Sequence, residues 1–241
     1  MENFRNKNIL VVGGSSGIGL ALVKQLLARE ANVFTVSRRE APEDLPPATK
    51  HLSLDITSDN VTPLQNFLPE VLHGLAYCPG TITLKPFHRL QIRDFQHDLE
   101  VNLLGAVRSI QCALPPLKQS GGAGVILFST VASRVGMNFH ASIAAAKAAV
   151  QGLAVSLAAE LAPQYIRVNV IAPSITMTPL AGQLLSSEQK QDASAQRHPL
   201  KQIGQPGEMA AMAVHLLSPD AGWITGQVIG VDGGMSTLRP I

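Results

Sequence analysis

A glycine-rich segment near the start of the chain has the composition and spacing of a phosphate-binding loop. It lies between an apolar run at residues 8–12 and a helical pattern that begins at Ile18. Glycine lets the backbone turn sharply and lets a pyrophosphate approach it closely. The first turn of the following helix offers free N–H groups and the positive end of a dipole to that pyrophosphate. In this strand–loop–helix context we predict a dinucleotide site formed by Gly13, Ser15, Ser16, Gly17, Ile18 and Gly19.

The residues after the second apolar run indicate which dinucleotide is bound. An NAD site places Asp or Glu there to hold the ribose 2′-hydroxyl, whereas an arginine accommodates the 2′-phosphate of NADP. This chain has Ser37-Arg38-Arg39 at that place. A guanidinium forms a forked, charge-assisted pair with phosphate, and a serine hydroxyl can donate one more hydrogen bond. We therefore expect NADP(H), held in part by Ser37 and Arg38.

Alternating strands and helices must position these residues. Short apolar runs predict strands at 8–12, 33–36, 49–54, 75–78, 125–129, 166–171 and 228–231, and longer periodic segments predict helices at 18–30, 58–72, 91–117, 141–162 and 206–217. Strands that alternate with helices pair in parallel and carry helices on both faces. We predict one α/β domain over residues 1–241, a doubly wound parallel sheet (Rossmann fold) of about seven strands. The most polar stretch, 180–205, is interpreted as a mobile substrate-binding flap.

Composition argues against several other classes of protein. The 241 residues carry a net charge of +2, and no basic cluster is longer than Arg38-Arg39, so no nucleic-acid partner is expected. Cys78 and Cys112 lack the spacing of metal ligands, and no metal site is predicted. No apolar run reaches the ~18 residues that span a membrane, and the polar start does not resemble a signal peptide. We expect a cytoplasmic protein that acts on a small molecule.

The glycine spacing GxxxGxG and several later segments resemble the short-chain dehydrogenase/reductase family over most of the chain. These segments are Asp55-Ile56, Asn102, Ser129-Thr130, Lys147, the run from Arg167 to Pro173, Ile224-Thr225-Gly226-Gln227 and Val231-Asp232-Gly233-Gly234. The resemblance implies a homotetramer built partly on the helix at 141–162. It implies a catalytic set that includes Asn102, Thr130 and Lys147. It also implies cofactor contacts from Asp55, Ile56, Pro79, Gly80, Lys147, Pro173, Thr176 and Thr178.

One member of the family's catalytic set is missing from this chain. In the family a tyrosine four positions before the lysine protonates the oxyanion, and the lysine ammonium lowers its pKa. Ile143 stands at that position and cannot donate a proton. Lys147 keeps its other family role, which is to hydrogen-bond the nicotinamide ribose. Smaller departures are Val12 for threonine, Tyr77-Cys78-Pro79-Gly80 for Asn-Asn-Ala-Gly, and Pro173-Ser174 for Pro-Gly.

Two side chains are candidates to replace the tyrosine as the acid. His140 lies seven positions before Lys147 on the same helical face, the spacing that the enoyl-acyl-carrier-protein reductase branch uses for its tyrosine. The alternative for His140 is a helix-start residue facing solvent. Tyr77 follows the fourth strand, and its alternative is a ring packed beneath the cofactor. The other histidines are interpreted as surface or satisfied core residues: His51, His73, His88, His97, His198 and His215.

Three functions are consistent with these residues. The first is an NADP(H)-dependent oxidoreductase that reduces a carbonyl or an activated C=C bond with a proton donor other than tyrosine. The second is a catalytically silent protein that senses NADP(H) or pairs with an active homologue. The third is a non-redox enzyme on the same scaffold. The complete glycine loop, Asn102 and Lys147 favour the first, whereas Ile143 favours the second.

Overall fold

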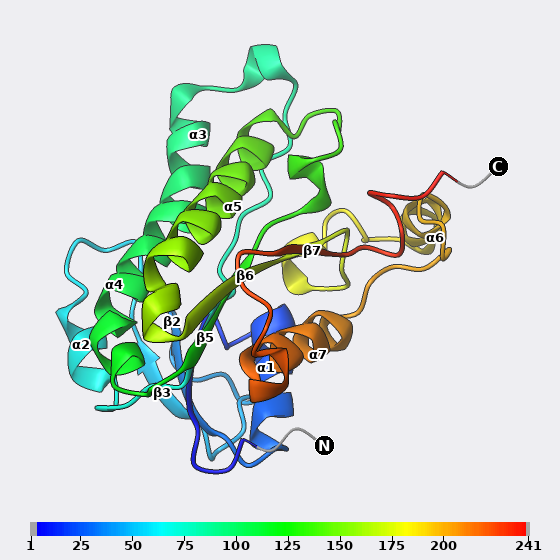
Figure 1. Cartoon of the computed structure of the whole chain (residues 1–241). Coiled ribbons are helices and arrows are strands. Elements are labelled where there is room, and N and C mark those ends of the chain that lie inside the picture. The colour runs from blue at the N-terminus through cyan, green and yellow to red at the C-terminus, as the bar shows by residue number, and fades with distance from the viewer. Residues whose placement is uncertain (1–3, 240–241) are drawn as a thin grey trace.

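Runs of aliphatic and β-branched residues form seven strands that pair in parallel in the order β3-β2-β1-β4-β5-β6-β7 (Figure 1). The computed structural model describes residues 4–239. The strands are β1 (Asn8–Val12), β2 (Asn32–Ser37), β3 (Lys50–Ser53), β4 (Gly74–Tyr77), β5 (Ala123–Phe128), β6 (Ile166–Pro173) and β7 (Val228–Val231). The predicted doubly wound parallel sheet is confirmed. The ends of the predicted domain, residues 1–3 and 240–241, lie outside the described residues.

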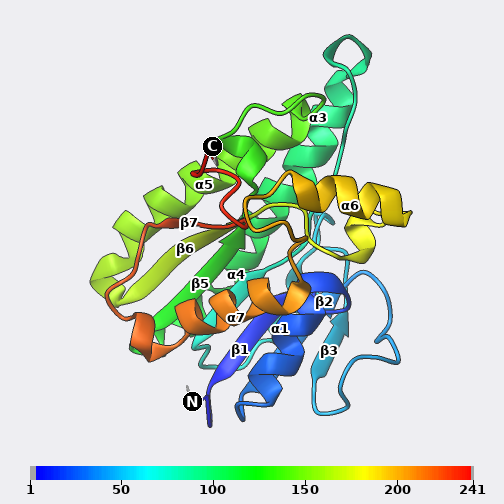
Figure 2. The same cartoon turned by 90° about the vertical axis from the view of Figure 1, so that its right-hand side faces the viewer.

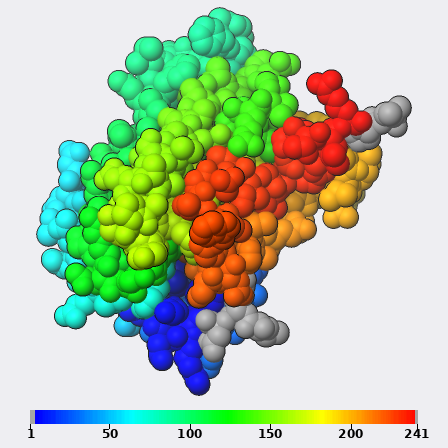
Figure 3. Space-filling view, viewed as in Figure 1, coloured from blue at the N-terminus to red at the C-terminus, as the bar shows by residue number. Residues whose placement is uncertain are grey.

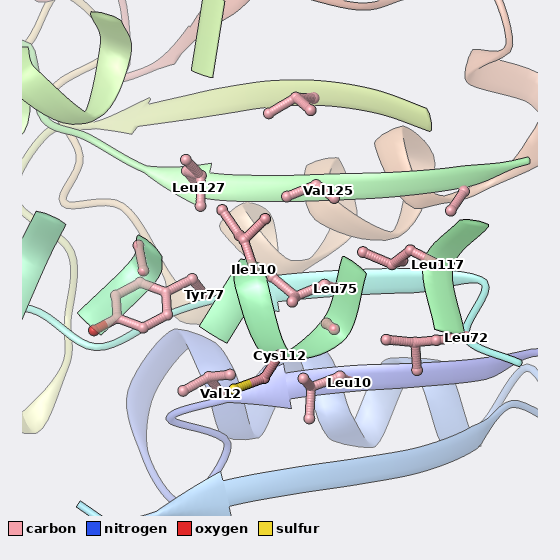
Figure 4. Packing of buried hydrophobic residues seen from close by; sticks show 14 of the residues in the cluster. Leu10, Val12, Leu72, Leu75, Tyr77, Ile110, Cys112, Leu117, Val125 and Leu127 are labelled. Atoms are coloured by element: carbon pink, nitrogen blue, oxygen red, sulfur yellow. The ribbon is translucent and has the colours of Figure 1, made fainter. Parts of the chain in front are cut away.

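Alternation of side chains along the strands separates two apolar cores. In β1, Leu10 and Val12 pack with the layer of α2 (Thr62–Phe67), α4 (Gly105–Lys118) and α5 (Ala141–Leu161). Ile9 and Val11 pack with α1 (Gly17–Leu27) and α7 (Pro206–Leu217) on the other face (Figure 2). Figure 4 shows how α4 sets Ile110 against the strands of the first core. Each fully buried aliphatic side chain contributes about 1.5–3 kcal/mol, so both faces of the sheet are anchored.

The helix predicted at 58–72 is much shorter in the structure. It forms only the six-residue α2, and Leu68 follows it in an extended conformation with ψ 146°. Pro69 explains the early end, because a proline disfavours the helical conformation of the residue before it. The chain then runs without regular structure to β4.

The helix predicted at 91–117 is divided by an irregular turn. It consists of α3 (Ile92–Leu99), a π-helical turn at Glu100–Leu104 and α4. A capping box between Gln91 and Asp94 fixes the start of α3. The π-turn holds Asn102, one of the predicted site residues, at 1% exposure. Such turns occur frequently at functional sites.

The long helix α5 differs from expectation in one respect. Its extension Ala141–Gln164 is long and apolar enough to cross a membrane by length and composition, although no apolar run of that length was predicted. The buried core helix of a globular protein meets the same criteria. α5 packs Val150, Ala154 and Ala158 into the first core, against the sheet.

Residues 180–205 contain structure that was not predicted. They include α6 (Glu188–Gln196), whose start is capped by the Ser187 hydroxyl accepting from the Lys190 N–H. Leu185 is 4% exposed and anchors the segment, whereas the neighbouring Leu184 is 36% exposed. The α6 region lies beside the C-terminal segment in all three whole-chain views (Figures 1, 2 and 3), and the Leu200 N–H donates to the Gly233 carbonyl. We keep the name flap for residues 180–205.

Candidate active site

The glycine loop has the geometry that a dinucleotide requires. Gly13 has φ +80°, and a Cβ there would lie 3.0 Å from the Pro79 ring. A Cβ on Gly19 would lie 2.2 Å from the Gly13 carbonyl oxygen, so no side chain fits between the loop and α1. Ser16 is the N-cap residue of α1 but makes no side-chain capping bond. The first-turn N–H groups of α1 therefore have no side-chain cap and suit a phosphate.

The end of β2 presents one arginine to solvent and engages the serine before it. Arg38 is exposed and forms no ion pair within residues 4–239. The Ser37 hydroxyl lies 2.9 Å from His51 Nε2 and donates to the Arg39 carbonyl at 3.2 Å. His51, predicted to be a surface or core residue, thus orients this hydroxyl. A ligand would compete with His51 and the Arg39 carbonyl for the Ser37 hydroxyl. The Arg38 guanidinium, in contrast, has no ion pair to break among residues 4–239.

Asp55 and Ile56, both predicted cofactor contacts, have different environments. Burial pushes the pKa of Asp55 up, but hydrogen bonds from Thr57 and the Arg38 charge together hold it below its usual value. Asp55 is therefore a carboxylate at neutral pH. Ile56 is 5% exposed and belongs to the first core.

A cavity of about 300 Å³ opens where β4, β5 and β6 end. It brings together most of the predicted catalytic and nicotinamide-side residues. These are Ile18, Gly80, Thr130, His140, Lys147, Pro173, Thr176 and Thr178. Ile143 lies in the wall at 5% exposure, where the family's tyrosine is expected. The predicted residues thus share one site, and that site has an aliphatic side chain in place of the phenol.

Two adjacent hydroxyl residues follow β5 directly, and they have different partners. The Ser129 hydroxyl donates to the Lys147 carbonyl at 3.0 Å and so fastens β5 to α5. Thr130 accepts a weak capping bond from the Ala132 N–H at 3.3 Å and lines the cavity. Thr130 is therefore the better placed of the two to donate to a ligand oxygen, as its predicted role requires.

Lys147 is 8% exposed, and its ammonium donates to the Phe128 carbonyl at 2.8 Å. Burial lowers the pKa of Lys147 to about 8, and the charge of Asp98 partly opposes this shift. Burial raises the pKa of the neighbouring Cys78 thiol to about 12, so that thiol is neutral at pH 7. Lys147 thus stands at the cavity with protons to donate and one fixed bond to the backbone.

Asn102 reaches the same region from the π-turn. Its amide nitrogen donates to the Asp98 carbonyl at 2.7 Å and to the Thr81 hydroxyl at 2.8 Å, and its buried Oδ1 has no hydrogen-bond partner in the described part of the chain. A Cβ on Gly80 would lie 3.3 Å from that oxygen and 3.5 Å from Lys147 Nζ. Gly80 therefore keeps the space between Asn102 and Lys147 free. An unpaired buried acceptor is costly, so this oxygen suits a donor that the site binds.

His140 and Tyr77, the two candidate acids, lie in different parts of the structure. His140 begins α5, is half-buried and lines the cavity, with Nδ1 2.7 Å from the Asn138 carbonyl oxygen. Tyr77 is 2% exposed, donates to the Val101 carbonyl at 2.5 Å and lies outside the cavity lining. Burial raises the pKa of Tyr77 far above its usual value. The hypothesis that Tyr77 is the acid is wrong, because its hydroxyl holds the π-turn.

His198 was interpreted from the sequence as a surface or satisfied core residue, and its position in the cavity lining was not predicted. His198 in the flap is 2% exposed, and its Nε2 lies 2.7 Å from the hydroxyl of Ser174, the residue after β6. Its Nδ1 lies 2.9 Å from the Ser194 carbonyl oxygen. The one signal in the sequence was Ser174 itself, which stands where the family has glycine. Nothing in the spacing connected it to a histidine 24 residues away.

Comparison with known proteins decides the family. A sequence model described as "Enoyl-(Acyl carrier protein) reductase" matches residues 12–236. The chain belongs to the short-chain dehydrogenase/reductase family. A tropinone reductase homologue of Arabidopsis thaliana is 32% identical over 247 residues, which cover 97% of this chain and 94% of that protein.

Solved structures that cover nearly the whole chain are similar to it. The ligand-free aldohexose dehydrogenase of Thermoplasma acidophilum has a TM-score of 0.91 at 26% identity, covering 99% of this chain and 97% of that one. ElxO with NADP bound has a TM-score of 0.89 at 25% identity, covering 97% and 100%. The family consists of oxidoreductases that use a nicotinamide dinucleotide, and the uncapped α1 and the unpaired Asn102 Oδ1 fit such a group. The described residues contain no cluster that could hold a metal ion.

Proposed function

We propose that this oxidoreductase uses NADP(H) to reduce a carbonyl or an activated C=C bond of a small molecule. The observation that carries the proposal is the cavity that joins the glycine loop, through Ile18, to Thr130 and Lys147. The bound cofactor supplies hydride and accepts it in the reverse direction. The side chains of this cavity must bind the substrate, orient it and supply the proton.

The residues divide the work of binding between the two ends of the dinucleotide. The free N–H groups of α1 hold the pyrophosphate, and the guanidinium of Arg38 pairs with the 2′-phosphate. Lys147 donates to the nicotinamide ribose, and Thr176 and Thr178 border the nicotinamide end of the cavity. The unengaged Arg38 is the feature that favours NADP(H) over NAD(H), because no acidic side chain occupies the end of β2.

Ile143 occupies the position of the family's tyrosine, so no phenol at this position can donate the proton. A substrate whose developing charge is spread, such as a quinone or an enone, needs a weaker proton donor than a simple ketone does. Thr130 can hydrogen-bond the developing oxyanion. His140, the predicted proton donor, is half-buried on the cavity wall and is one candidate for this role.

Assembly and location complete the proposal. Small side chains on α5, among them Ala144, Ala145 and Ala148, permit close packing of a second copy, so we propose a homotetramer. The proposed location is the cytoplasm, where NADPH and small carbonyl compounds are available.

The test is NADPH oxidation by the purified protein against a panel of ketones, quinones and enones, followed by loss of NADPH absorbance. Lys147→Ala is the control, because it should lose most of both cofactor affinity and rate. Turnover of at least one activated substrate is expected. Tight NADPH binding without turnover of any panel member would contradict the proposal and favour the silent NADP(H)-binding protein, the alternative that Ile143 supports.

A further inference from the structure

The pair Ser174–His198 is built like a proton relay. His198 Nδ1 faces a carbonyl oxygen, which only accepts, so this nitrogen carries a proton. The other ring nitrogen, Nε2, lies 2.7 Å from the Ser174 hydroxyl. A neutral imidazole accepts the serine proton there, whereas an imidazolium donates and frees that proton for the cavity. The Met235 sulfur, 3.1 Å from the same hydroxyl, is a weaker acceptor and does not compete strongly.

Ser174 stands beside the place where the substrate oxygen must lie. Phe128, the last residue of β5, pairs with Ile171 of β6, so Thr130, two residues after β5, lies at about the height of Pro173, the last residue of β6. Neighbouring strands lie about 4.8 Å apart. Ser174 is the next residue, and it lines the same cavity as Thr130 and Lys147. A ligand oxygen between the two strand ends is therefore within reach of both hydroxyls.

The surroundings hold the imidazole in this orientation. His198 is 2% exposed, its own N–H donates to the Ala195 carbonyl at 3.0 Å, and the Gly233 backbone lies beside the ring. Both ring nitrogens are hydrogen-bonded, so the burial of this polar side chain is compensated and its orientation is fixed. Its partner Ser174 is only half-buried and opens to the cavity, which favours a role toward a ligand.

We propose that Ser174 is the catalytic hydroxyl that exchanges a proton with the substrate oxygen, and that His198 is the positioning residue that supplies or receives this proton. The inference rests on the proposed reductase function. In reduction, hydride adds to the carbonyl carbon and the C=O electron pair moves to oxygen. That oxygen takes the Ser174 proton, and Ser174 takes the Nε2 proton of the imidazolium. A proton from solvent later restores the imidazolium. In oxidation the same protons move in reverse, from the alcohol to a neutral His198.

The relay takes the substrate's proton from Ser174, whereas the sequence prediction takes it from His140. Variants of these residues therefore distinguish the two proton donors. The probe is phenanthrenequinone with NADPH. We expect Ser174→Ala to lower kcat about 100-fold, on the scale of lost general-acid catalysis, with NADPH affinity unchanged. Ser174→Thr keeps the hydroxyl and should keep most of the rate. His198→Gln can still donate a hydrogen bond but cannot relay a proton, and it should lower kcat as Ser174→Ala does. His88→Phe, at an exposed histidine outside the cavity lining, is the control and should stay near wild type, whereas His140→Phe should lower kcat less than Ser174→Ala does.

A rate for Ser174→Ala close to wild type would overturn the relay, and a loss confined to His140→Phe would place the proton donor on α5. A readout without turnover keeps the two proposals distinguishable. In protein labelled with nitrogen-15 histidine, phenanthrenequinone added with NADP⁺ should shift the His198 ring resonances in the wild type and not in Ser174→Ala. If the wild type oxidises NADPH with no member of the panel of ketones, quinones and enones, the proposed function fails. An unmoved His198 resonance in the wild type overturns the relay itself.

Discussion

The Ser142 hydroxyl donates a 2.6 Å hydrogen bond to the carboxylate of Asp98 across 44 residues of sequence. Asp98 is fully buried, and its other oxygen accepts from the hydroxyls of Thr81 and Thr83 at 2.6 and 2.8 Å. The cluster joins the start of α5, the end of α3 and the segment after β4. These are the elements that carry His140, Asn102 and Gly80, so the cluster fixes one wall of the cavity.

Removing one donor from this cluster should cost stability. Ser142→Ala leaves a buried carboxylate oxygen with one hydrogen bond fewer, and bonds to charged groups contribute about 1.5–3 kcal/mol. We expect the free energy of unfolding to fall by that amount in urea titration. Ser186→Ala, an exposed serine in the flap, is the matched control and should change little. Equal stability of the two variants would show that Ser142 adds nothing to the cluster.

Arg38 should determine which dinucleotide binds. Its guanidinium is exposed and forms no ion pair among residues 4–239, and a lost charged contact costs about 1.5–3 kcal/mol. Arg38→Ala should therefore weaken NADPH binding at least tenfold and leave NADH binding nearly unchanged. Calorimetric titration of both cofactors measures this, with Arg29→Ala as a control far from the end of β2. A wild type that binds NADH and NADPH equally well would refute the NADP(H) assignment.

The burial of Lys147 should make stability depend on pH. Its pKa falls from 10.5 to about 8 on folding, so between these values the unfolded chain binds more protons and stability rises with pH. Below pH 8 both states are protonated, and burying the charge costs up to about 3 kcal/mol. Lys147→Met should be more stable than the wild type at pH 7, and this advantage should shrink as the pH approaches 10. An advantage that does not change with pH would show that the ammonium carries no burial cost.

Restoring the phenol should change the substrates that are reduced. Ile143→Tyr places a hydroxyl four residues before Lys147, whose positive charge lowers a phenol pKa. We expect turnover of simple ketones that the wild type reduces slowly. Ile143→Phe fills similar space without a hydroxyl and should show no gain. If both variants are equally slow with ketones, the remaining cavity does not orient a ketone for reduction.

The proposed homotetramer can be measured directly. Val155 on α5 is 51% exposed among small alanines, and burying it in an interface would remove apolar surface from water. Light scattering at micromolar concentration should give four times the mass of the chain, 25.5 kDa. Val155→Glu should shift the mass downward. A monomeric wild type would end this proposal.

Local patterns predicted the sheet and the cofactor side of the site. Every strand except the edge strand β3 is a short, mainly apolar run, and the glycine loop and Lys147 are defined by neighbours within a few residues. The pairs Ser174–His198 and Asp98–Ser142 were not predictable, because tertiary structure brings each together over 24 and 44 residues. Sequence reasoning missed α6 for a different reason: its residues are almost all polar and have no apolar stripe.

The π-turn at Glu100–Leu104 restricts insertions and deletions in this part of the chain. A π-turn contains one residue more than the α-helical turn it replaces. Deleting a residue there would rotate α3 against α4 by about 100° and would turn Asp98 away from Ser142. Surface loops such as the one before β3 can gain or lose residues without this penalty. Relatives that retain the buried carboxylate should therefore keep the residue count from Gln91 to Gly105 unchanged, even where the flap has been rebuilt for another substrate.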